Sequence, residues 1–325
     1  MSKAVRIHAP GGPENLRYDD VEVGDPGPGE IRIRQTAIGL NYIDVYHRTG
    51  LYPLGDLPHA IGLEAAGVID ALGEGVGGLG VGDRVAYAAP PVGAYAEVRL
   101  MPADRVVALP DAIADETGAA MMLQGMTVEY LIRRTYRVKA GETVLLHAAA
   151  GGVGLIACQW LKHLGATVIG TVGSPEKAEL ARAHGCDHPV NYREESFVEK
   201  VKEITGGHGV PVVYDSIGKD TWDDSLDCLQ PLGLMVTFGN ASGPVPPINL
   251  GVLGQKGSLY VTRPTLMTYT AKREDLEASA KALFDVVLSG AVKIEVNQTY
   301  PLAEAAQAHR DLEARKTTGS TILLP

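Results

Sequence analysis

Apolar and polar residues alternate over several short stretches in the first 110 residues of the chain. These stretches, punctuated by Gly and Pro, are KAVRI (3–7), EIRIRQTAI (30–38), AAGVIDAL (65–72), DRVAYAA (83–89) and AYAEVRL (94–100). Alternation with a period of two residues is typical of antiparallel strands. Between residues 110 and 136, apolar residues recur three and four positions apart, which predicts a helix. We therefore expect a β domain that ends near this helix.

The pattern then changes to apolar strands that alternate with helical segments. The six strand candidates are TVLLHAA (143–149), TVIGTVG (167–173), HPVNY (188–192), VVYDSIG (212–218), LMVTFG (234–239) and SLYVT (258–262). The helical segments between the first five are GVGLIACQWLKHLG (152–165), SPEKAELARAHG (174–185), SFVEKVKEITGG (196–207) and TWDDSLDCLQPLG (221–233). Such alternation predicts an α/β doubly wound parallel sheet of the dinucleotide-binding type. Two more helical patterns and a terminal strand, STILLP (320–325), are expected to pack back on the first domain.

Length and composition narrow the class of protein. A chain of 325 residues exceeds the size at which one hydrophobic core usually stops growing, so two domains are expected. The net charge of −10 disfavours a nucleic-acid partner. Cys158, Cys186 and Cys228 are too few and too widely spaced for a disulfide framework or a zinc ribbon. With no apolar run of ~18 residues and a charged N-terminus, we expect a cytoplasmic protein without a membrane partner.

The strongest local signal is HAAAGGVGLIACQWLKHLG, from His147 to Gly165, which closes one strand and opens a helix. Small residues at such a turn let the backbone approach phosphate groups, while the helix N-terminus presents free N–H groups. The turn has the spacing of the dinucleotide fingerprint with Ala in the first position. Its predicted cofactor-binding residues are Ala149, Gly151, Gly152, Val153 and Gly154. The alternative is a glycine-rich turn without a ligand.

A literal G-x-G-x-x-G motif occurs elsewhere, at residues 73–78. It leads through a further turn into a strand at 83–89, so no helix N-terminus follows it. We therefore predict a simple turn there.

The end of the second predicted strand indicates which nicotinamide cofactor binds. An NAD site usually has an acidic residue there, whereas this strand ends in Gly173 and Ser174. Ser174 is a predicted N-cap, which puts Lys177 in the first turn of the next helix. A cation is unfavourable in that turn unless an anion lies nearby, and the 2′-phosphate of NADPH is such an anion. The alternative is that Lys177 is a solvated lysine beside Glu176.

Other candidate cofactor residues follow from the ends of the predicted strands. Ser216, Phe238 and Asn240 lie at the carboxyl ends of the fourth and fifth strands, where a doubly wound sheet receives its ligand. Tyr192, at the end of the third strand, is expected at the same end of the site as Lys177. Arg315 is a candidate for the 2′-phosphate, with a solvated arginine at a helix end as the alternative.

Several segments in one order carry a family resemblance. They are LNYIDVYHRTGLYP (40–53), GLEAAGVI (62–69), VGDRV (81–85), AAAGGVG (148–154), GTVGSPEKAE (170–179) and VVYDSIGKDTWDDSLDCLQPLGLMVTFGN (212–240). Through them the whole chain resembles the zeta-crystallin-like quinone oxidoreductases of the medium-chain dehydrogenase/reductase superfamily. The resemblance implies a GroES-like, partly open β-barrel catalytic domain of residues 1–122, completed by 265–325. It also implies an NADP-binding Rossmann domain of residues 123–264 and a homodimer joined through the Rossmann edge strands.

The resemblance also bears on metal binding. Zinc-dependent members of the superfamily bind catalytic zinc through a Cys and through the His of a Gly-His-Glu segment, whereas this chain has Asn41 and Leu63 at the corresponding positions. Because neither residue is a usual zinc ligand, we expect no catalytic metal. The cluster His184, Cys186, Asp187 and His188 is interpreted as a helix end followed by a strand entry.

By resemblance, the activity is the reduction of quinones by NADPH without a metal ion. Asn41, Tyr46 and Thr127 are then expected near the nicotinamide half of the cofactor. Tyr52 and Arg263 are expected along the acceptor cleft, and with Asn41 and Tyr46 they are the candidate catalytic residues. Asn41 can also be explained as a buried amide and Arg263 as the partner of an acid. Aromatic packing is the alternative for both tyrosines.

Two other functions stay open at this point. One is NADPH-dependent reduction of activated C=C bonds in enones or enoyl thioesters, since both reactions put hydride on an electron-poor π system. The other is the RNA-binding or structural crystallin-like role of some relatives, which the acidic net charge disfavours. The densest basic stretch, 133–139, is interpreted as a solvated helix face.

Overall fold

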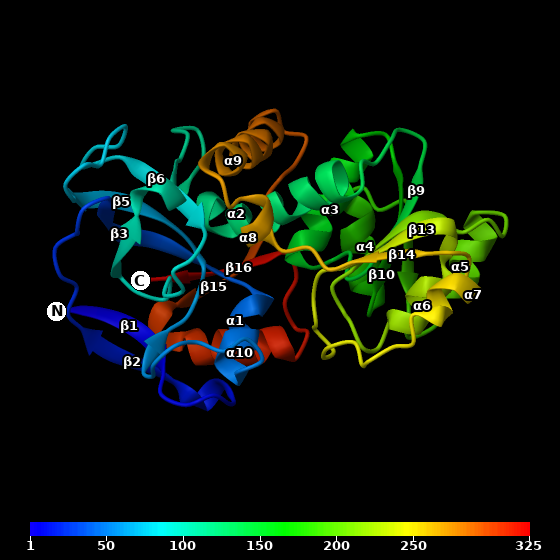
Figure 1. Ribbon diagram of the computed structural model, residues 1–325, viewed down its shortest axis with the longest axis horizontal. Coiled ribbons are helices and arrows are strands. Elements are labelled where there is room, and N and C mark those ends of the chain that lie inside the picture. The colour runs from blue at the N-terminus through cyan, green and yellow to red at the C-terminus, as the bar shows by residue number, and fades with distance from the viewer. The chain divides into compact units, whose positions relative to one another are not determined.

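The computed structural model describes residues 1–325 and divides them into two compact units (Figure 1). The first unit consists of Met1–Met126, Thr270–Leu288 and Ile294–Pro325, and the second of Thr127–Tyr269 and Ser289–Lys293. The first boundary falls inside helix α2 (Asp115–Tyr130). These bounds differ by a few residues from the domain boundaries expected from the resemblance, at 122/123 and 264/265, which remain a prediction.

The first unit is built on two sheets whose pairings are antiparallel, except for one parallel pair formed by the last two strands. Its strands are β1 (Ser2–Ile7), β2 (Leu16–Val21), β3 (Glu30–Leu40), β4 (His59–Ala60), β5 (Glu64–Leu72), β6 (Arg84–Ala88), β7 (Val98–Pro102), β8 (Val107–Ala108), β15 (Val296–Pro301) and β16 (Ser320–Leu324). The larger sheet has the order β15-β16-β3-β5-β6-β8, with β7 also paired to β3, and the smaller has the order β2-β1-β4. Ile31 and Ile33 of β3 are fully buried, while Arg32 and Arg34, which alternate with them, are not, as the predicted alternation requires.

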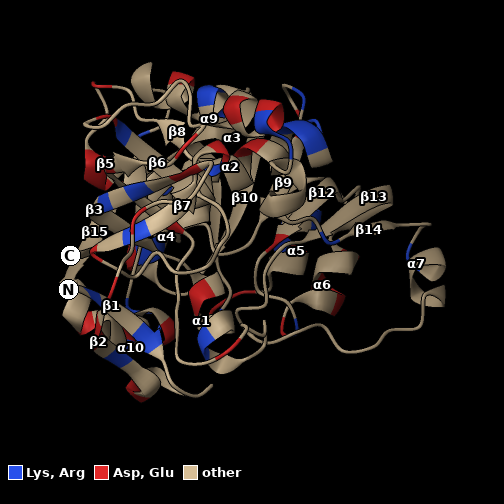
Figure 2. Cartoon of the chain, turned by 60° about the vertical axis from the view of Figure 1, so that its left-hand side comes forward, with Lys and Arg blue, Asp and Glu red and all other residues tan.

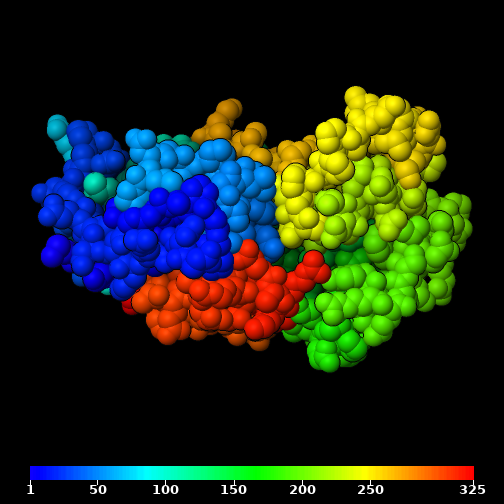
Figure 3. Space-filling model, turned by 90° about the horizontal axis from the view of Figure 1, so that it is seen from below, coloured from blue at the N-terminus to red at the C-terminus, as the bar shows by residue number.

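The C-terminal segment completes the first unit. β16 pairs antiparallel with β3, so that Thr321 lies opposite Leu40. Helix α10 (Ala305–Glu313) contributes Ala305 and Ala308 to the core that β1, β3 and β5 form. Figure 3 shows this segment, in red and orange, on the surface beside the blue N-terminal residues. The remaining helices of the unit are α1 (Tyr42–Thr49) and α9 (Arg273–Leu288).

Helix α9 illustrates how charge is distributed on this unit. Figure 2 shows both signs of charge interspersed along it. Arg273 pairs with Glu277 and Lys281 with Asp285, each one helical turn apart. Such exposed pairs add only ~0.3–0.5 kcal/mol each to helix stability, but they leave no face of a single sign.

The second unit is a six-stranded parallel sheet of the order β11-β10-β9-β12-β13-β14. Its strands are β9 (Thr143–Leu146), β10 (Thr167–Val172), β11 (His188–Asn191), β12 (Val210–Asp215), β13 (Leu229–Thr237) and β14 (Tyr260–Thr262). Its helices are α3 (Gly152–His163), α4 (Pro175–Ala183), α5 (Phe197–Ile204), α6 (Trp222–Asp227), α7 (Gly251–Gln255) and α8 (Leu266–Tyr269). The six predicted strands and their doubly wound order are confirmed.

One predicted element of this unit is wrong in its second half. The helix expected over 221–233 ends as α6 at Asp227, and β13 begins at Leu229. Pro231 and Gly233 do not continue a helix, and Leu229 instead pairs with Val210 of β12. None of the helices in the structure combines the length and the apolar content that a membrane crossing requires.

Candidate active site

The small-residue turn after β9 is a helix N-terminus, as predicted. Gly151 is the N-cap of α3 in an extended conformation, and no side chain caps the helix there. The N–H groups of the first turn, at residues 152–154, therefore have no partner within the helix. Ala148 takes a φ of 55°, which turns the chain sharply between strand and helix. This geometry leaves a ring of backbone donors at the positive end of the helix dipole, which suits a phosphate.

Close packing fixes the turn in place. A Cβ at Gly154 would lie 2.2 Å from the carbonyl oxygen of Ala148, so only glycine fits there. Ala149 is fully buried, and its N–H donates to the Thr171 carbonyl at 3.0 Å. A Cβ at Gly170 would in turn lie 2.6 Å from the Ala149 Cβ. Small residues are thus required on both sides of the strand–helix contact.

A buried polar network supports the same turn, and the sequence analysis did not find it. Asp215 Oδ2 accepts from Ser225 Oγ at 3.1 Å, so Ser225 accepts in turn from His147 Nε2 at 2.9 Å. His147 Nδ1 then accepts from Thr171 Oγ1 at 2.9 Å, and Thr171 Oγ1 accepts from the N–H of Ala148 at 3.3 Å. Burial lowers the pKa of His147 and thereby favours the neutral ring that these directions require. The only signal of this network in the sequence is a set of polar residues at strand ends.

The literal G-x-G-x-x-G motif at 73–78, called the decoy motif below because it resembles a phosphate-binding sequence, is a turn between β5 and β6, as predicted. Gly75 and Gly78 have φ angles of 81° and 76°, values that favour glycine in a tight turn. No helix follows, so this motif offers no phosphate site.

The structure confirms the predicted cap at the start of α4. Ser174 Oγ accepts from the N–H of Lys177 at 3.3 Å, and Pro175 is the first helical residue. A Cβ at Gly173 would lie 2.7 Å from the Tyr192 hydroxyl, so that hydroxyl lies directly against the end of β10. Lys177 is half-buried and Tyr192 is 42% exposed. Gly173, Ser174, Lys177 and Tyr192 therefore come together at the carboxyl ends of β10 and β11.

A second group of predicted residues meets at the ends of β12 and β13. A Cβ at Gly239 would lie 2.3 Å from the Ser216 carbonyl oxygen, so the segments that follow β12 and β13 are in contact there. Arg263 Nη1 donates to the Gly239 carbonyl at 3.0 Å. Asn240 is satisfied when its amide oxygen accepts from Arg263 Nη2 at 3.0 Å. Phe238, one residue before Gly239, donates its N–H to the Asp215 carbonyl at 2.7 Å.

In the first unit, Asn41 is the N-cap of α1 and is only 6% exposed. Asp44 Oδ2 accepts from its backbone N–H at 2.9 Å, and Glu64 Oε2 accepts from its side-chain Nδ2 at 2.5 Å. Gln124 Nε2 donates to its Oδ1 at 3.1 Å. Burial raises the pKa of Glu64 to about 8 and that of Asp44 to about 7. Leu63, at the second position that would hold zinc, is 3% exposed.

The predicted tyrosines lie on and after α1. Tyr46 is buried, and its ring meets the ring of Tyr52 edge-on at 5.2 Å. Tyr42 contacts the Tyr46 ring at 5.6 Å. The structure thus brings Tyr46 and Tyr52 together in an aromatic cluster that starts one residue after Asn41.

Two other predicted residues lie apart from these groups within their own units. Thr127 is buried on α2, next to the boundary of the second unit. Arg315 is exposed in the first unit, two residues after the end of α10, with a φ of 59°.

A chain of buried polar groups links α1 to α10, and it also escaped the sequence analysis. Glu313 accepts two hydrogen bonds of 2.8 Å from Arg48. Arg48 Nη1 donates to His309 Nδ1 at 3.0 Å, so His309 Nε2 carries the proton and donates to Tyr95 Oη at 3.0 Å. Tyr95 donates in turn to Asp44 Oδ2 at 3.0 Å. Burial, with the Arg48 charge, lowers the pKa of His309 to about 3.

Residues of the two clusters that could suggest other functions have partners within the fold. His184 Nδ1 bonds to the Leu180 carbonyl at 2.8 Å, while Asp187 forms an ion pair with Lys162. Gly185 has a φ of 92°, as expected for the end of α4. In the basic stretch, Arg134 lies 5.0 Å from the centre of the Tyr269 ring.

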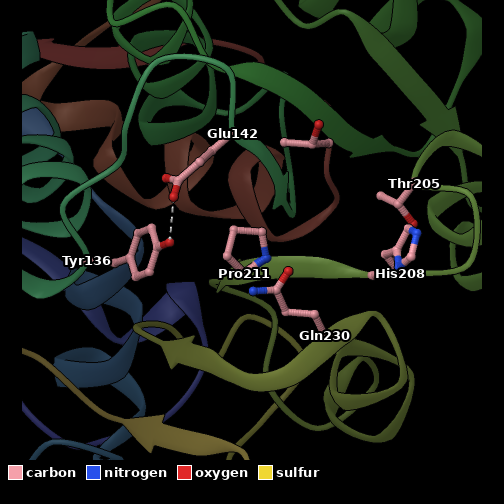
Figure 4. Close-up of a pocket in the computed structure, with 8 residues that line it drawn as sticks. Tyr136, Glu142, Thr205, His208, Pro211 and Gln230 are labelled. Carbon is pink, nitrogen blue, oxygen red and sulfur yellow. Dashed lines mark hydrogen bonds between the residues drawn. The ribbon is translucent and has the colours of Figure 1, made fainter.

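A pocket of about 320 Å³ opens at the other edge of the parallel sheet (Figure 4). Its lining residues are Tyr136, Glu142, Thr143, Thr205, His208, Gly209, Pro211 and Gln230. Thr143 begins β9, whereas the phosphate turn follows the end of that strand. The pocket is therefore at the amino edge, away from the edge where a doubly wound sheet binds nucleotides.

Comparisons with known proteins agree with this geometry. The family model described as "Alcohol dehydrogenase GroES-like domain" matches residues 27–111, and the one described as "Zinc-binding dehydrogenase" matches residues 152–284. A quinone oxidoreductase of Pseudomonas aeruginosa is 56% identical, with both chains covered completely. A 2-haloacrylate reductase of a Burkholderia species is 50% identical over 100% of this chain and 99% of its own.

A solved structure extends the similarity to the fold. The crystal structure of an Escherichia coli quinone oxidoreductase complexed with NADPH superposes with a TM-score of 0.98 at 52% identity, covering 99% of this chain and 100% of that one. Sequence similarity over the whole length and a shared fold establish the family. The chain belongs to the quinone oxidoreductases of the alcohol dehydrogenase-like superfamily.

Proposed function

We propose that this protein is an NADPH-dependent oxidoreductase that reduces quinones without a metal ion. The observation that carries the proposal is the closely packed turn at 148–154, whose backbone donors face the carboxyl edge of the sheet. The Escherichia coli relative that shares this fold is complexed with NADPH. The turn fits a pyrophosphate because glycine is required at its tightest point.

The chain's own residues divide the work of holding the cofactor. The N–H groups at the start of α3 bind the pyrophosphate, and Lys177 neutralises the 2′-phosphate, with Ser174 and Tyr192 beside it. Arg315 is assigned to the same phosphate. Ser216, Phe238 and Asn240 bind along the ends of β12 and β13. When bound, NADPH supplies a hydride to an electron-poor acceptor, and the residues around it need only position that acceptor and exclude water.

The roles at the reacting end follow the family resemblance. Asn41, Tyr46 and Thr127 are assigned to the nicotinamide, and Tyr52 and Arg263 to the acceptor. The absence of zinc from the mechanism is supported by the chemistry of the donor set. Asn41 already uses its amide in hydrogen bonds to Glu64 and Gln124, and Leu63 offers no ligand atom.

A second candidate function is the reduction of activated C=C bonds. It is favoured by the 50% identity to a 2-haloacrylate reductase over nearly the full length of both chains. Quinones and 2-haloacrylates are both electron-poor π systems, so one hydride donor serves either of them.

Turnover of the two acceptor classes by the same enzyme preparation tests the choice. NADPH oxidation is followed with 1,4-benzoquinone, with 9,10-phenanthrenequinone, with 2-chloroacrylate and with a 2-alkenal. We expect kcat/KM to be highest for a quinone, and NADH to bind at least about tenfold more weakly than NADPH. If 2-chloroacrylate exceeds both quinones by orders of magnitude, the protein is a C=C reductase. Salt-dependent retention on RNA without any reductase activity would instead support the binding role.

The functional unit is proposed to be a cytoplasmic homodimer joined through β14. This strand ends the sheet and pairs only with β13. Tyr260 and Val261 on it are 61% and 37% exposed, and Leu250 nearby in the chain is 72% exposed. An uncovered strand edge with apolar side chains favours pairing with a second copy. Sedimentation at twice the monomer mass of 34.3 kDa checks the assignment. Three buried free cysteines support a reducing compartment.

A further inference from the structure

We propose that Glu64 is a positioning residue that sets which way round the Asn41 amide faces its ligand, with Gln124 completing the arrangement. Neither residue was among the predicted site residues. The inference rests on the proposed function, because it takes Asn41 as a residue at the nicotinamide. What carries it is a continuous set of hydrogen bonds through side chains that are nine-tenths buried or more.

Four side chains from distant parts of the sequence form this set. Glu64 Oε1 accepts from the N–H of Leu123 at 2.8 Å, and its Oε2 accepts from Asn41 Nδ2 at 2.5 Å. Gln124 Nε2 donates to Asn41 Oδ1 at 3.1 Å. Ser320 Oγ lies 2.8 Å from Gln124 Oε1 and 2.9 Å from the Ala120 carbonyl oxygen. Asn41, Glu64 and Gln124 are 6%, 0% and 6% exposed.

The donors and acceptors fix a direction. A peptide N–H can only donate, so Glu64 Oε1 accepts from Leu123. The pKa of Glu64 is raised to about 8, and above that pH the ionised carboxylate accepts on its second oxygen as well. The Asn41 amide must therefore turn its NH₂ group toward Glu64 and its oxygen toward Gln124. One N–H of the amide remains for a ligand, because the amide oxygen also takes part in the capping box with the N–H of Asp44. A nicotinamide carboxamide or an acceptor oxygen would meet this N–H.

Exchange of one atom reverses the whole set without leaving a polar group unpaired. In the Glu64→Gln variant, the amide oxygen takes the Leu123 N–H, so the new NH₂ group must donate to Asn41. Asn41 then turns over and donates to Gln124, which turns over and donates to the Ser320 hydroxyl. Ser320 donates to the Ala120 carbonyl, which already lies within reach. The fold keeps its hydrogen bonds while the face that Asn41 offers to a ligand is inverted.

Steady-state kinetics and stability measurements on Glu64→Gln test the proposal. At about pH 9, where Glu64 is ionised, and at saturating NADPH and quinone, we expect kcat to fall by roughly 10- to 100-fold, the usual result of misdirecting a group at the reacting centre. The affinity for NADPH should change less than about threefold, because the phosphate contacts are untouched. The midpoint of urea unfolding should stay the same. A merely structural role would lower that midpoint and leave kcat per folded enzyme unchanged.

A double-mutant cycle with Asn41→Ala shows whether Glu64 acts through Asn41. If it does, Glu64→Gln lowers kcat in the native background and has no further effect in the Asn41→Ala background. Equal losses in both backgrounds would overturn the proposal, as would an unchanged kcat in Glu64→Gln.

Glu142→Gln is the matched control. Glu142 also accepts from a peptide N–H, that of Lys139 at 2.8 Å, and from a side-chain donor, Tyr136 Oη at 3.0 Å. Glu142 lines the pocket at the amino edge of the sheet. The kcat of the Glu142→Gln variant should therefore equal that of the native enzyme. Failure of the proposed function is distinguishable, because the native protein would then neither bind NADPH nor reduce any quinone.

Discussion

The phosphate turn of the second unit and the surroundings of Asn41 in the first are built on opposite principles. The turn uses seven consecutive residues, 148–154, and offers a ligand only backbone N–H groups. The Asn41 region uses side chains from residues 41, 64, 124 and 320, which come from four distant segments. Backbone donors cannot be turned over, whereas an amide side chain can. The first kind of site is therefore sensitive to bulk, and the second to the identity of single hydrogen-bonding atoms.

The largest expected effect comes from adding bulk to the turn. In Gly154→Ala, the new Cβ would lie 2.2 Å from a carbonyl oxygen, so strand and helix must separate. Such overpacking typically costs about 1–3 kcal/mol in unfolding free energy. Displacing the donors should also weaken NADPH by roughly 100-fold or more, which fluorescence titration measures.

The decoy motif supplies the control for this prediction. A Cβ at Gly77 meets nothing within 4 Å, so Gly77→Ala should change neither stability nor NADPH affinity. Equal behaviour of the two variants would contradict the assignment of the cofactor to the turn at 148–154.

A smaller effect is expected at the edge of the nucleotide site. Lys177→Ala removes one charge-assisted hydrogen bond of ~1.5–3 kcal/mol, so NADPH should bind roughly ten- to a hundredfold more weakly. NADH, which lacks the 2′-phosphate, should bind as before. Calorimetric titration with both cofactors measures the difference.

Lys200→Ala is a suitable control for the loss of a lysine. Lys200, on α5, forms ion pairs with Glu195 just before the helix and with Glu203 within it, rather than lying at the end of β10. Its removal should leave the preference for NADPH intact. Unchanged NADPH affinity in Lys177→Ala would remove the basis for this cofactor preference.

The smallest effect concerns the buried polar chain of the first unit. The pKa of His309 is lowered to about 3, so the unfolded chain takes up a proton below about pH 6.5 while the folded protein does not. The stability that depends on the neutral ring is complete above pH 6.5 and is lost as the pH falls toward 3. This amounts to about 1 kcal/mol between pH 6.5 and 5.5.

The variant His309→Gln isolates this contribution. Its amide oxygen can accept from Arg48 and its NH₂ group can donate to Tyr95, without titrating. Urea unfolding at a series of pH values should therefore show a shallower loss of stability on acidification than in the native protein. Asp44 and Glu64, whose pKa values are raised, act in the opposite sense and are common to both proteins. Parallel pH curves would argue against a neutral buried His309.

The same contrast explains what the sequence could predict. The parallel sheet, the turn at 148–154, the Ser174 cap and the decoy at 73–78 all follow from contiguous patterns, because backbone geometry is encoded locally. The helix predicted over 221–233 was too long because the apolar residues of the following strand, β13, continue its pattern.

The side-chain networks lay beyond such patterns. Arg48 and His309 are 261 positions apart, and Ser320 and Gln124 are 196 apart. No periodicity relates residues at these separations, so only the folded sheet reveals that they meet. The individual roles of Asn41, Tyr46, Tyr52 and Arg263 in the reaction stay predictions for the same reason.

The position of β16 has a consequence for how the protein is made. A ribosome releases residues 320–324 only after every segment of the second unit has been synthesised. The nucleotide-binding sheet can therefore close on the nascent chain, whereas the first unit waits for its final strand before Ser320 can reach Gln124. Translation that stops before residue 320 would yield a chain that still binds the dinucleotide but lacks the ordered surroundings of Asn41.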